Sequence, residues 1–134
     1  MKPSIYLSCI VVLFLFATCK KDTATLNQNY IPVNKCRTYY NDSISICLDS
    51  VLQDSRCPVN VVCIWQGIAV ARFKVNTSNT EHLITLANWK FQSYIKDTTV
   101  VGFKIEFINL SGQTEATKSF GYKDYVAEVK VTKI

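Results

Sequence analysis

The chain has 134 residues, six of them cysteines, and a formal net charge of +5, a length that suits one domain. Its basic residues are scattered, since only Lys20 and Lys21 are adjacent, and no basic stripe is interleaved with aromatic residues. This distribution argues against a nucleic-acid partner and indicates a small domain with a mildly basic, solvated surface.

The N-terminal segment starts with Lys2, continues with the apolar run 10–16 and ends in Ala-Thr-Cys at 17–19. A basic start, an apolar stretch and small residues before a cysteine resemble a bacterial lipoprotein signal peptide. The resemblance implies a signal peptide at 1–18, cleavage before Cys19 and a diacylglycerol thioether on its sulfur. It also implies that the protein is lipid-anchored in the bacterial cell envelope. The expected membrane is the outer one, with the protein either on its periplasmic face or on the cell surface.

Two other interpretations of this segment stay open, an uncleaved membrane anchor and an ordinary secretion signal. As a helix, residues 5–17 would span about 20 Å, less than the hydrocarbon core of about 30 Å, so the run is short for a membrane span. Cleavage near Ala17 would leave Cys19 as a spare thiol. Cys9 lies inside the segment that is removed.

Residues 19–34 are mostly polar and lack periodicity. We interpret them as the lipidated cysteine followed by a flexible tether, with an end-to-end distance of about 20 Å. Residues 35–134 are then expected to form a single β-rich domain.

From Cys36 onward, apolar residues recur with period two, which is typical of β-strands. The alternating segments are 44–48, 61–75, 101–107 and 125–131, with a weaker one at 82–86. Gly67 inside the second segment suggests a bulge or a close approach of two backbones. Polar turn sequences stand at 76–79, 110–113 and 120–122. Five to eight short strands with such turns predict an all-β fold, an antiparallel β-sandwich or a small barrel.

Four cysteines remain when Cys9 and Cys19 are set aside. An even number in an oxidising compartment predicts two disulfides. Of the three possible pairings we favour Cys36–Cys47 and Cys57–Cys63, because the members of each pair are close in sequence and separated by turn-forming residues. A zinc site is the alternative, but zinc ligands usually come in closer pairs than these.

The most distinctive segment is Asp54-Ser55-Arg56-Cys57-Pro58 followed by Cys63-Ile64-Trp65-Gln66-Gly67. Its pattern, D-S-R-C-P-x4-C-x-W-x-G, resembles a motif of small secreted and lipoprotein domains of bacteria. The resemblance implies a β-rich extracytoplasmic domain and brings no activity with it.

The residues of this motif also make physical sense by themselves. Asp54 can accept a hydrogen bond from the backbone N–H of Arg56, and the Arg56 side chain either pairs with Asp54 or lies exposed. Pro58 stiffens the entry to the disulfide loop, and Trp65 can pack against the bridge as a buried tryptophan. We interpret the segment as a stapled loop that holds two sheets together. A recognition loop formed by these four residues is the functional alternative.

Four of the six aspartates are followed by Ser or Thr and then by Ala, Ile, Val or Thr. This pattern resembles the O-glycosylation acceptor motif of Bacteroidetes envelope proteins, and Cys-Lys-Lys-Asp at 19–22 also resembles lipoproteins of that phylum. The resemblance implies modification at one or more of Thr23, Ser43, Ser50 and Thr98. Asp-Ser and Asp-Thr are also ordinary turn formers, which is the alternative interpretation.

Nothing in the sequence assembles a catalytic centre. The one histidine, His82, shares its register with apolar Ile84 and Leu86, so we interpret it as structural. The acidic residues are isolated from one another, and no glycine-rich phosphate loop is present. We therefore expect no enzyme activity, no cofactor and no metal.

Two functions remain after these exclusions. The preferred one is a lipid-anchored binding or structural module of the envelope that presents loops of a β-sandwich to a protein or glycan partner. The alternative is a protease inhibitor in which the stapled loop around Arg56 enters an active site, because rigid loops bind with little ordering cost. A hydrolase is a distant third.

Overall fold

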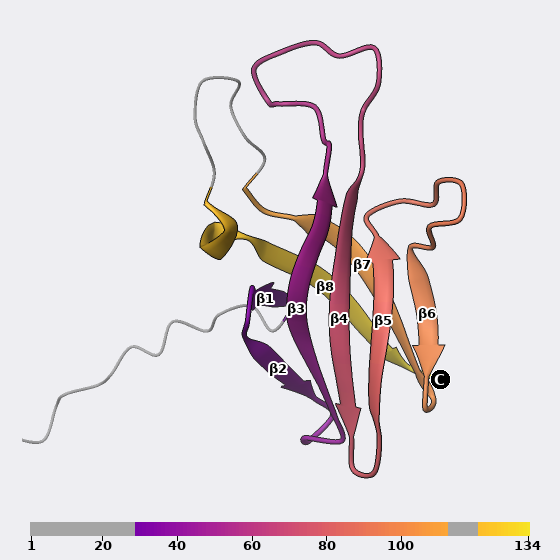
Figure 1. Cartoon of the computed structure of the whole chain (residues 1–134). Coiled ribbons are helices and arrows are strands. Elements are labelled where there is room, and N and C mark those ends of the chain that lie inside the picture. The colour runs from indigo at the N-terminus through magenta and orange to yellow at the C-terminus, as the bar shows by residue number, and fades with distance from the viewer. Residues whose placement is uncertain (1–28, 113–120) are drawn as a thin grey trace, which may run out of the picture.

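The computed structural model describes residues 29–112 and 121–134 (Figure 1). Its strands are β1 (Tyr30–Pro32), β2 (Cys36–Tyr39), β3 (Ile44–Asp54), β4 (Ala69–Thr77), β5 (Glu81–Ala87), β6 (Asp97–Val100), β7 (Phe103–Leu110) and β8 (Val126–Lys133). They form two four-stranded antiparallel sheets, ordered β1-β8-β7-β6 and β2-β3-β4-β5. The sheets are not closed into a barrel. The predicted all-β fold is confirmed, and of its two forms the sandwich is the one observed.

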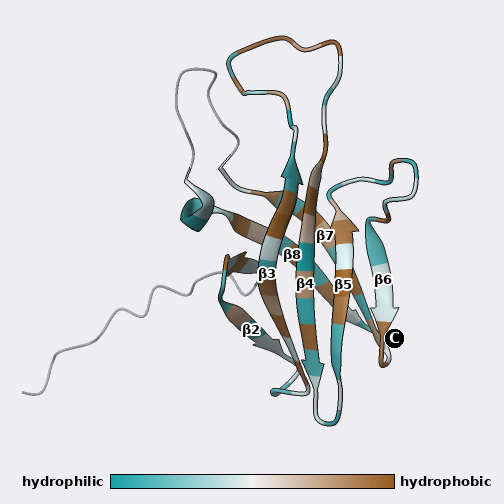
Figure 2. Ribbon diagram, in the orientation of Figure 1, coloured by the Kyte–Doolittle hydropathy of each residue, from teal (hydrophilic) through white to brown (hydrophobic). Residues whose placement is uncertain are grey.

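The hydrophobic core lies between the two sheets. Along β3, the side chains of Ile44, Ile46 and Leu48 are fully buried, as the period-two pattern predicts. Phe73 of β4 meets Phe107 of β7 with ring centroids 5.3 Å apart, so the inner faces of the sheets interdigitate. Figure 2 shows apolar and polar bands alternating along the strands, with the apolar positions contributing to this core.

The connections between strands divide the sandwich into two different ends (Figure 1). At one, which we call the hairpin end, tight turns join β2 to β3, β4 to β5 and β6 to β7. At the other, the loop end, long connections join β3 to β4 through residues 55–68 and β5 to β6 through residues 88–96. A single turn of 3-10 helix, η2 (Tyr122–Asp124), precedes β8.

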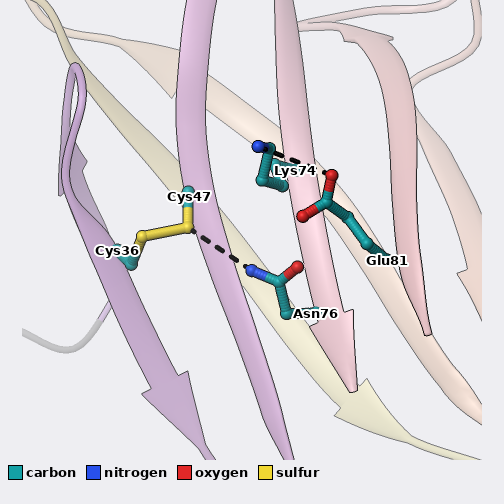
Figure 3. Close-up of a disulfide and its surroundings, with 5 residues drawn as sticks. All are labelled: Cys36, Cys47, Lys74, Asn76 and Glu81. Atoms are coloured by element: carbon teal, nitrogen blue, oxygen red, sulfur yellow. Dashed lines mark hydrogen bonds and ion pairs between the residues drawn. A yellow bond between two sulfur atoms is a disulfide. The ribbon is translucent and has the colours of Figure 1, made fainter. Parts of the chain in front are cut away.

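Both predicted disulfides are present. Cys36 and Cys47 are register partners on β2 and β3, with an S–S distance of 2.03 Å. This bridge lies on the outer face of its sheet, where Asn76 Nδ2 approaches Cys47 Sγ at 4.0 Å and Lys74 pairs with Glu81 at 3.5 Å (Figure 3). It fastens the edge strand β2 to the long strand β3. The second bridge, Cys57–Cys63, lies in the loop between β3 and β4.

Three sequence-based boundaries are corrected. Strand β1 pairs with β8 and contains the fully buried Ile31, so the tether does not extend to residue 34. A strand of three residues is too short to produce a period-two signal. The strand expected over 61–75 begins only at Ala69, because the residues before it form the loop. Val101, expected in a strand, lies in the turn between β6 and β7 with φ of 46°.

The predicted signal peptide at 1–18, Cys19 and Thr23 lie outside the described residues. Within 29–112 and 121–134, no helix has the length and apolar character that spanning a membrane would require.

Candidate binding loop

Residues 55–68 form the loop between β3 and β4, which we call the binding loop after the function that we propose for it. Main-chain hydrogen bonds brace its base. The Ser55 N–H donates to the Ile68 carbonyl at 2.9 Å, and the Cys57 N–H donates to the Gln66 carbonyl at 3.0 Å. The Ile68 N–H in turn donates to Ser55 Oγ at 3.2 Å. Beyond this ladder the Cys57–Cys63 disulfide closes the distal part. The loop is therefore long but constrained on both of its arms.

Gly67 is required where the two arms of the loop approach each other. Its φ is +72°, and a Cβ placed there would lie 1.8 Å from the carbonyl oxygen of Ser55. No other residue fits that space without moving the backbone. Its own carbonyl accepts a hydrogen bond from Trp89 Nε1 at 2.9 Å. The close backbone approach expected at Gly67 is confirmed, and it fixes the spacing of the arms.

An ion pair at the base of the loop connects the two sheets. Arg56 Nε lies 2.7 Å from Asp54 Oδ1 and Arg56 Nη2 lies 2.8 Å from Asp54 Oδ2. The Arg56 N–H also donates to Asp54 Oδ1 at 3.3 Å. The guanidinium donates further to the carbonyl of Leu110, which ends β7 in the opposite sheet. Of the two arrangements expected for Arg56, the structure shows pairing with Asp54.

The burial of this ion pair shapes its electrostatics. The exposed fractions of the Arg56 and Asp54 side chains are 6% and 13%. Burial alone would raise the pKa of Asp54, but the hydrogen bonds and the charge of Arg56 hold that pKa below its usual value. Tyr125, which hydrogen-bonds to Asp54, has a pKa raised by burial and by the negative charge of that carboxylate. The carboxylate thus stays ionised and locks strand ends from both sheets together.

An aromatic cluster supports the binding loop from the side. The rings of Trp65, Trp89 and Phe91 have centroids 4.8–5.6 Å apart. The last two come from the 88–96 loop and pack with Ile68 and Val70 in a second small hydrophobic cluster. Trp65 is 46% exposed, so it is not the buried tryptophan that the sequence suggested. Its aromatic neighbours follow more than twenty residues later in the chain, where no local pattern indicates them.

The distal part of the loop exposes aliphatic side chains, which we call the apolar tip: Val59, Val61, Val62 and Ile64. Val62 and Ile64 are 103% and 111% exposed, as open to solvent as side chains of an unfolded segment. Residues 57–68 contain no charged side chain, and Figure 2 shows the apolar colour along this loop. Grouped exposed apolar side chains mark surfaces that bind something.

The sequence pattern predicts that three of these tip residues, Val61, Val62 and Ile64, belong to a strand. The sequence nonetheless contains a feature that argues against a strand at these positions. A disulfide between Cys57 and Cys63 leaves too few residues between its ends for a strand with a core-facing side. Apolar residues held there have no inner face to occupy and must therefore point outward.

The proposed recognition residues do not all share one role. Asp54 and Arg56 point inward and brace the base, and Pro58 is half-buried at the entry to the disulfide loop. Trp65 is the only one of the four with a large exposed surface. The charged residues therefore support the loop from within, and Trp65 and the apolar tip are its exposed part.

The other sequence-predicted positions lie apart from this loop. Ser43 is exposed in the β2–β3 turn, with Oγ donating to the Tyr40 carbonyl at 2.7 Å. Ser50 on β3 and Thr98 on β6 are half-buried. His82 on β5 contacts Thr80 Oγ1 through Nε2 at 3.0 Å. In the part of the chain that the structure describes, no three His, Cys, Asp or Glu side chains are grouped to hold a metal ion.

The chain matches no protein-family model, no curated protein and no solved structure.

Proposed function

We propose that the protein is a binding module of the bacterial cell envelope, anchored through a lipid on Cys19, that contacts its partner with the binding loop. The apolar tip carries this proposal, because its aliphatic side chains are held in solvent by a disulfide, a glycine-dependent backbone contact and an aromatic cluster. A loop that is already ordered loses little conformational entropy on binding.

The two disulfides support a location outside the cytosol, since such bridges form and persist in oxidising compartments. The lipid anchor is tested by intact mass of the chain purified from its own host. We expect a polypeptide that starts at Cys19 and carries added acyl mass, and a Cys19→Ser variant that keeps its leader. A wild-type product that retains Met1 would contradict the anchor.

The partner of the loop is expected to present an apolar surface. The tip side chains have no polar atoms, so they offer little to a glycan, whose recognition depends on hydrogen bonds. A photo-crosslinking residue at position 64 should therefore form adducts in cells. The matched control is position 83, because Leu83 is 61% exposed on β5, far along the chain from the loop. Equal labelling from both positions would show that the loop is not the binding surface.

The protease-inhibitor alternative depends on a basic side chain that the loop does not present. The Arg56 guanidinium is bound by Asp54 and by the Leu110 carbonyl, and a protease would have to withdraw it from a buried ion pair. We expect no inhibition of a trypsin-like enzyme by the wild type or by Arg56→Ala. Inhibition by the wild type that Arg56→Ala abolishes would restore this alternative.

O-glycosylation is best accommodated at Ser43 among the three described acceptor positions. Its hydroxyl lies on an exposed turn, whereas Ser50 and Thr98 belong to strands. Protein from the native host should carry glycan mass on the Asp42-Ser43-Ile44 peptide, and Ser43→Ala should remove it. An unmodified peptide would exclude this position.

A further inference from the structure

The exposure of the apolar tip indicates which kind of surface it can bind. Val62 and Ile64 have essentially their full surface in solvent. A rigid protein partner would need a pocket already shaped around both side chains. The boundary between the headgroups and acyl chains of a bilayer is fluid and accommodates apolar side chains without a preformed cavity.

The two loops 55–68 and 88–96 carry charged side chains of one sign. Residues 55–68 and 88–96 together contain Arg56, Lys90 and Lys96 but no carboxylate. Arg56 is neutralised by Asp54 and Lys96 by Glu106, at 2.7 and 2.8 Å. Lys90, next to the aromatic cluster, is exposed. An apolar projection with an exposed ammonium group behind it complements an anionic membrane surface.

The aromatic residues are tied to the base of the loop. Trp89 Nε1 donates to the Gly67 carbonyl there, and Trp65, which is partly exposed, packs on Trp89. Indole rings have an apolar body and a polar N–H, and they gather at the level of lipid headgroups. The loop thus has aliphatic side chains in its distal part and tryptophan nearer its base, and the neighbouring 88–96 loop adds an exposed lysine. This is the order expected from hydrocarbon toward water.

We propose that the apolar tip docks on a phospholipid bilayer that carries anionic headgroups. Val62 and Ile64 enter the boundary of the acyl chains, Trp65 lies among the headgroups and Lys90 faces their phosphates. This inference rests on the proposed function, in which the binding loop is the contact surface of an anchored module, and it names the partner of that loop as lipid.

The two tryptophans are the only ones in the chain, so intrinsic fluorescence reports on this site. The full chain, purified from its host membranes, is reconstituted into phosphatidylcholine vesicles with or without phosphatidylglycerol. Quenching of tryptophan emission by lipids brominated on their acyl chains is then measured. We expect quenching in the wild type, stronger with phosphatidylglycerol, and a weaker response to phosphatidylglycerol in Lys90→Gln.

The test variant is Val62→Ser/Ile64→Ser, which should reduce the docked population roughly tenfold for each side chain, as expected when an aliphatic group is kept from hydrocarbon. The matched control is Leu83→Ser/Val101→Ser, which removes two apolar side chains that are 61% and 60% exposed elsewhere on the surface. The control should be quenched like the wild type. Unchanged unfolding transitions show that both variants are folded.

The possible failures are distinguishable. A wild type that stays attached to the vesicles but is not quenched overturns lipid docking and leaves the anchored binding module intact. Quenching that persists in the tip variant also overturns the inference. A protein adduct from position 64 without quenching identifies the partner as a protein. A chain that washes off the vesicles overturns the anchor and the docking together.

Discussion

The hairpin end and the loop end of the sandwich differ in how the chain reverses direction. At the hairpin end, a few residues with positive φ are enough, including Asn41 and Asp42 after β2 and Gly102 after β6. At the loop end, the binding loop needs a disulfide, a buried ion pair and an aromatic cluster. Because a short turn would connect β3 to β4 with far fewer supports, the length of the loop supports the contact with a partner that we propose.

The two disulfides show the same contrast. Cys36–Cys47 joins paired residues of neighbouring strands, so it reinforces contacts that the sheet already makes. Cys57–Cys63 joins two points of a segment that belongs to no sheet. The first bridge therefore stabilises the sandwich, and the second constrains the conformation of the binding loop.

One of the largest effects on stability should come from the ion pair at the loop end. Asp54→Asn leaves the Arg56 guanidinium buried beside a neutral amide and should lower the free energy of unfolding by about 3 kcal/mol, near the low end for a broken buried pair. The expected loss of stability is near the low end of that range because Arg56 keeps its hydrogen bond to the Leu110 carbonyl. The control is Glu81→Gln, which breaks the exposed Lys74–Glu81 pair and should cost less than about 1 kcal/mol. Urea titration measures both, and equal losses would refute the distinction between the two pairs.

The same pair predicts how stability changes with acid. The pKa of Asp54 is held below its usual value in the folded chain, so between that pKa and the unfolded value of about 4 the unfolded chain binds more protons. The contribution of Asp54 to stability is complete above the unfolded value and is lost as pH falls through the folded one. In urea titrations at a series of acidic pH values, the free energy of unfolding of Asp54→Asn should fall less steeply with decreasing pH than that of the wild type. An equally steep fall would contradict the lowered pKa of Asp54.

The glycines offer a second matched comparison between the ends. Gly67 and Gly102 have similar φ values of +72° and +78°, but only Gly67 has a backbone atom where a Cβ would lie. Gly102→Ala should cost about 1 kcal/mol, the strain of a left-handed residue. Gly67→Ala adds overpacking and should cost about 2–3 kcal/mol. Similar losses in urea titration would show that the loop arms separate easily.

The sequence predicts the strands whose apolar residues alternate over five or more positions. In β7 and β8, for example, Ile105, Phe107, Ala127 and Val129 are buried as expected. It does not predict β1 or β6, because three or four residues are too few for a period to appear. The β6–β7 turn is missed because Val101 is β-branched, and such residues rarely adopt positive φ.

The binding loop is predictable only in its local contacts. The Cys57–Cys63 bridge joins residues close in sequence, and spacing is enough to favour it. The Asp54–Arg56 pairing is also local, and the sequence offers it as one of two arrangements of Arg56. The packing of Trp65 on Trp89 depends on how β4 and β5 bring two distant loops together, and one sequence contains no signal for it. The exposure of the tip was missed because valine and isoleucine in a row also suit a buried strand.

Removing each disulfide should separate stability from loop shape. In the chain-entropy model, Cys36→Ser/Cys47→Ser should cost about 3 kcal/mol and Cys57→Ser/Cys63→Ser about 2 kcal/mol, because the second closes a shorter segment. Only the second pair should also make the peptide bonds that follow Val61 and Val62 accessible to proteases under native conditions. Limited proteolysis with mass readout checks this. Cleavage in the loop of the first variant alone would reverse the roles of the two bridges.

The smallest effect on stability is expected at the apolar tip. Val62→Ser and Ile64→Ser remove side chains that contact solvent, so each should change the free energy of unfolding by less than about 0.5 kcal/mol, as at other surface positions. Ile68→Ser, at the buried foot of the same loop, should cost about 2 kcal/mol or more. A large loss at the tip would mean that these side chains pack against the domain. A negligible loss, combined with reduced quenching on vesicles, would show that their exposure serves binding rather than folding.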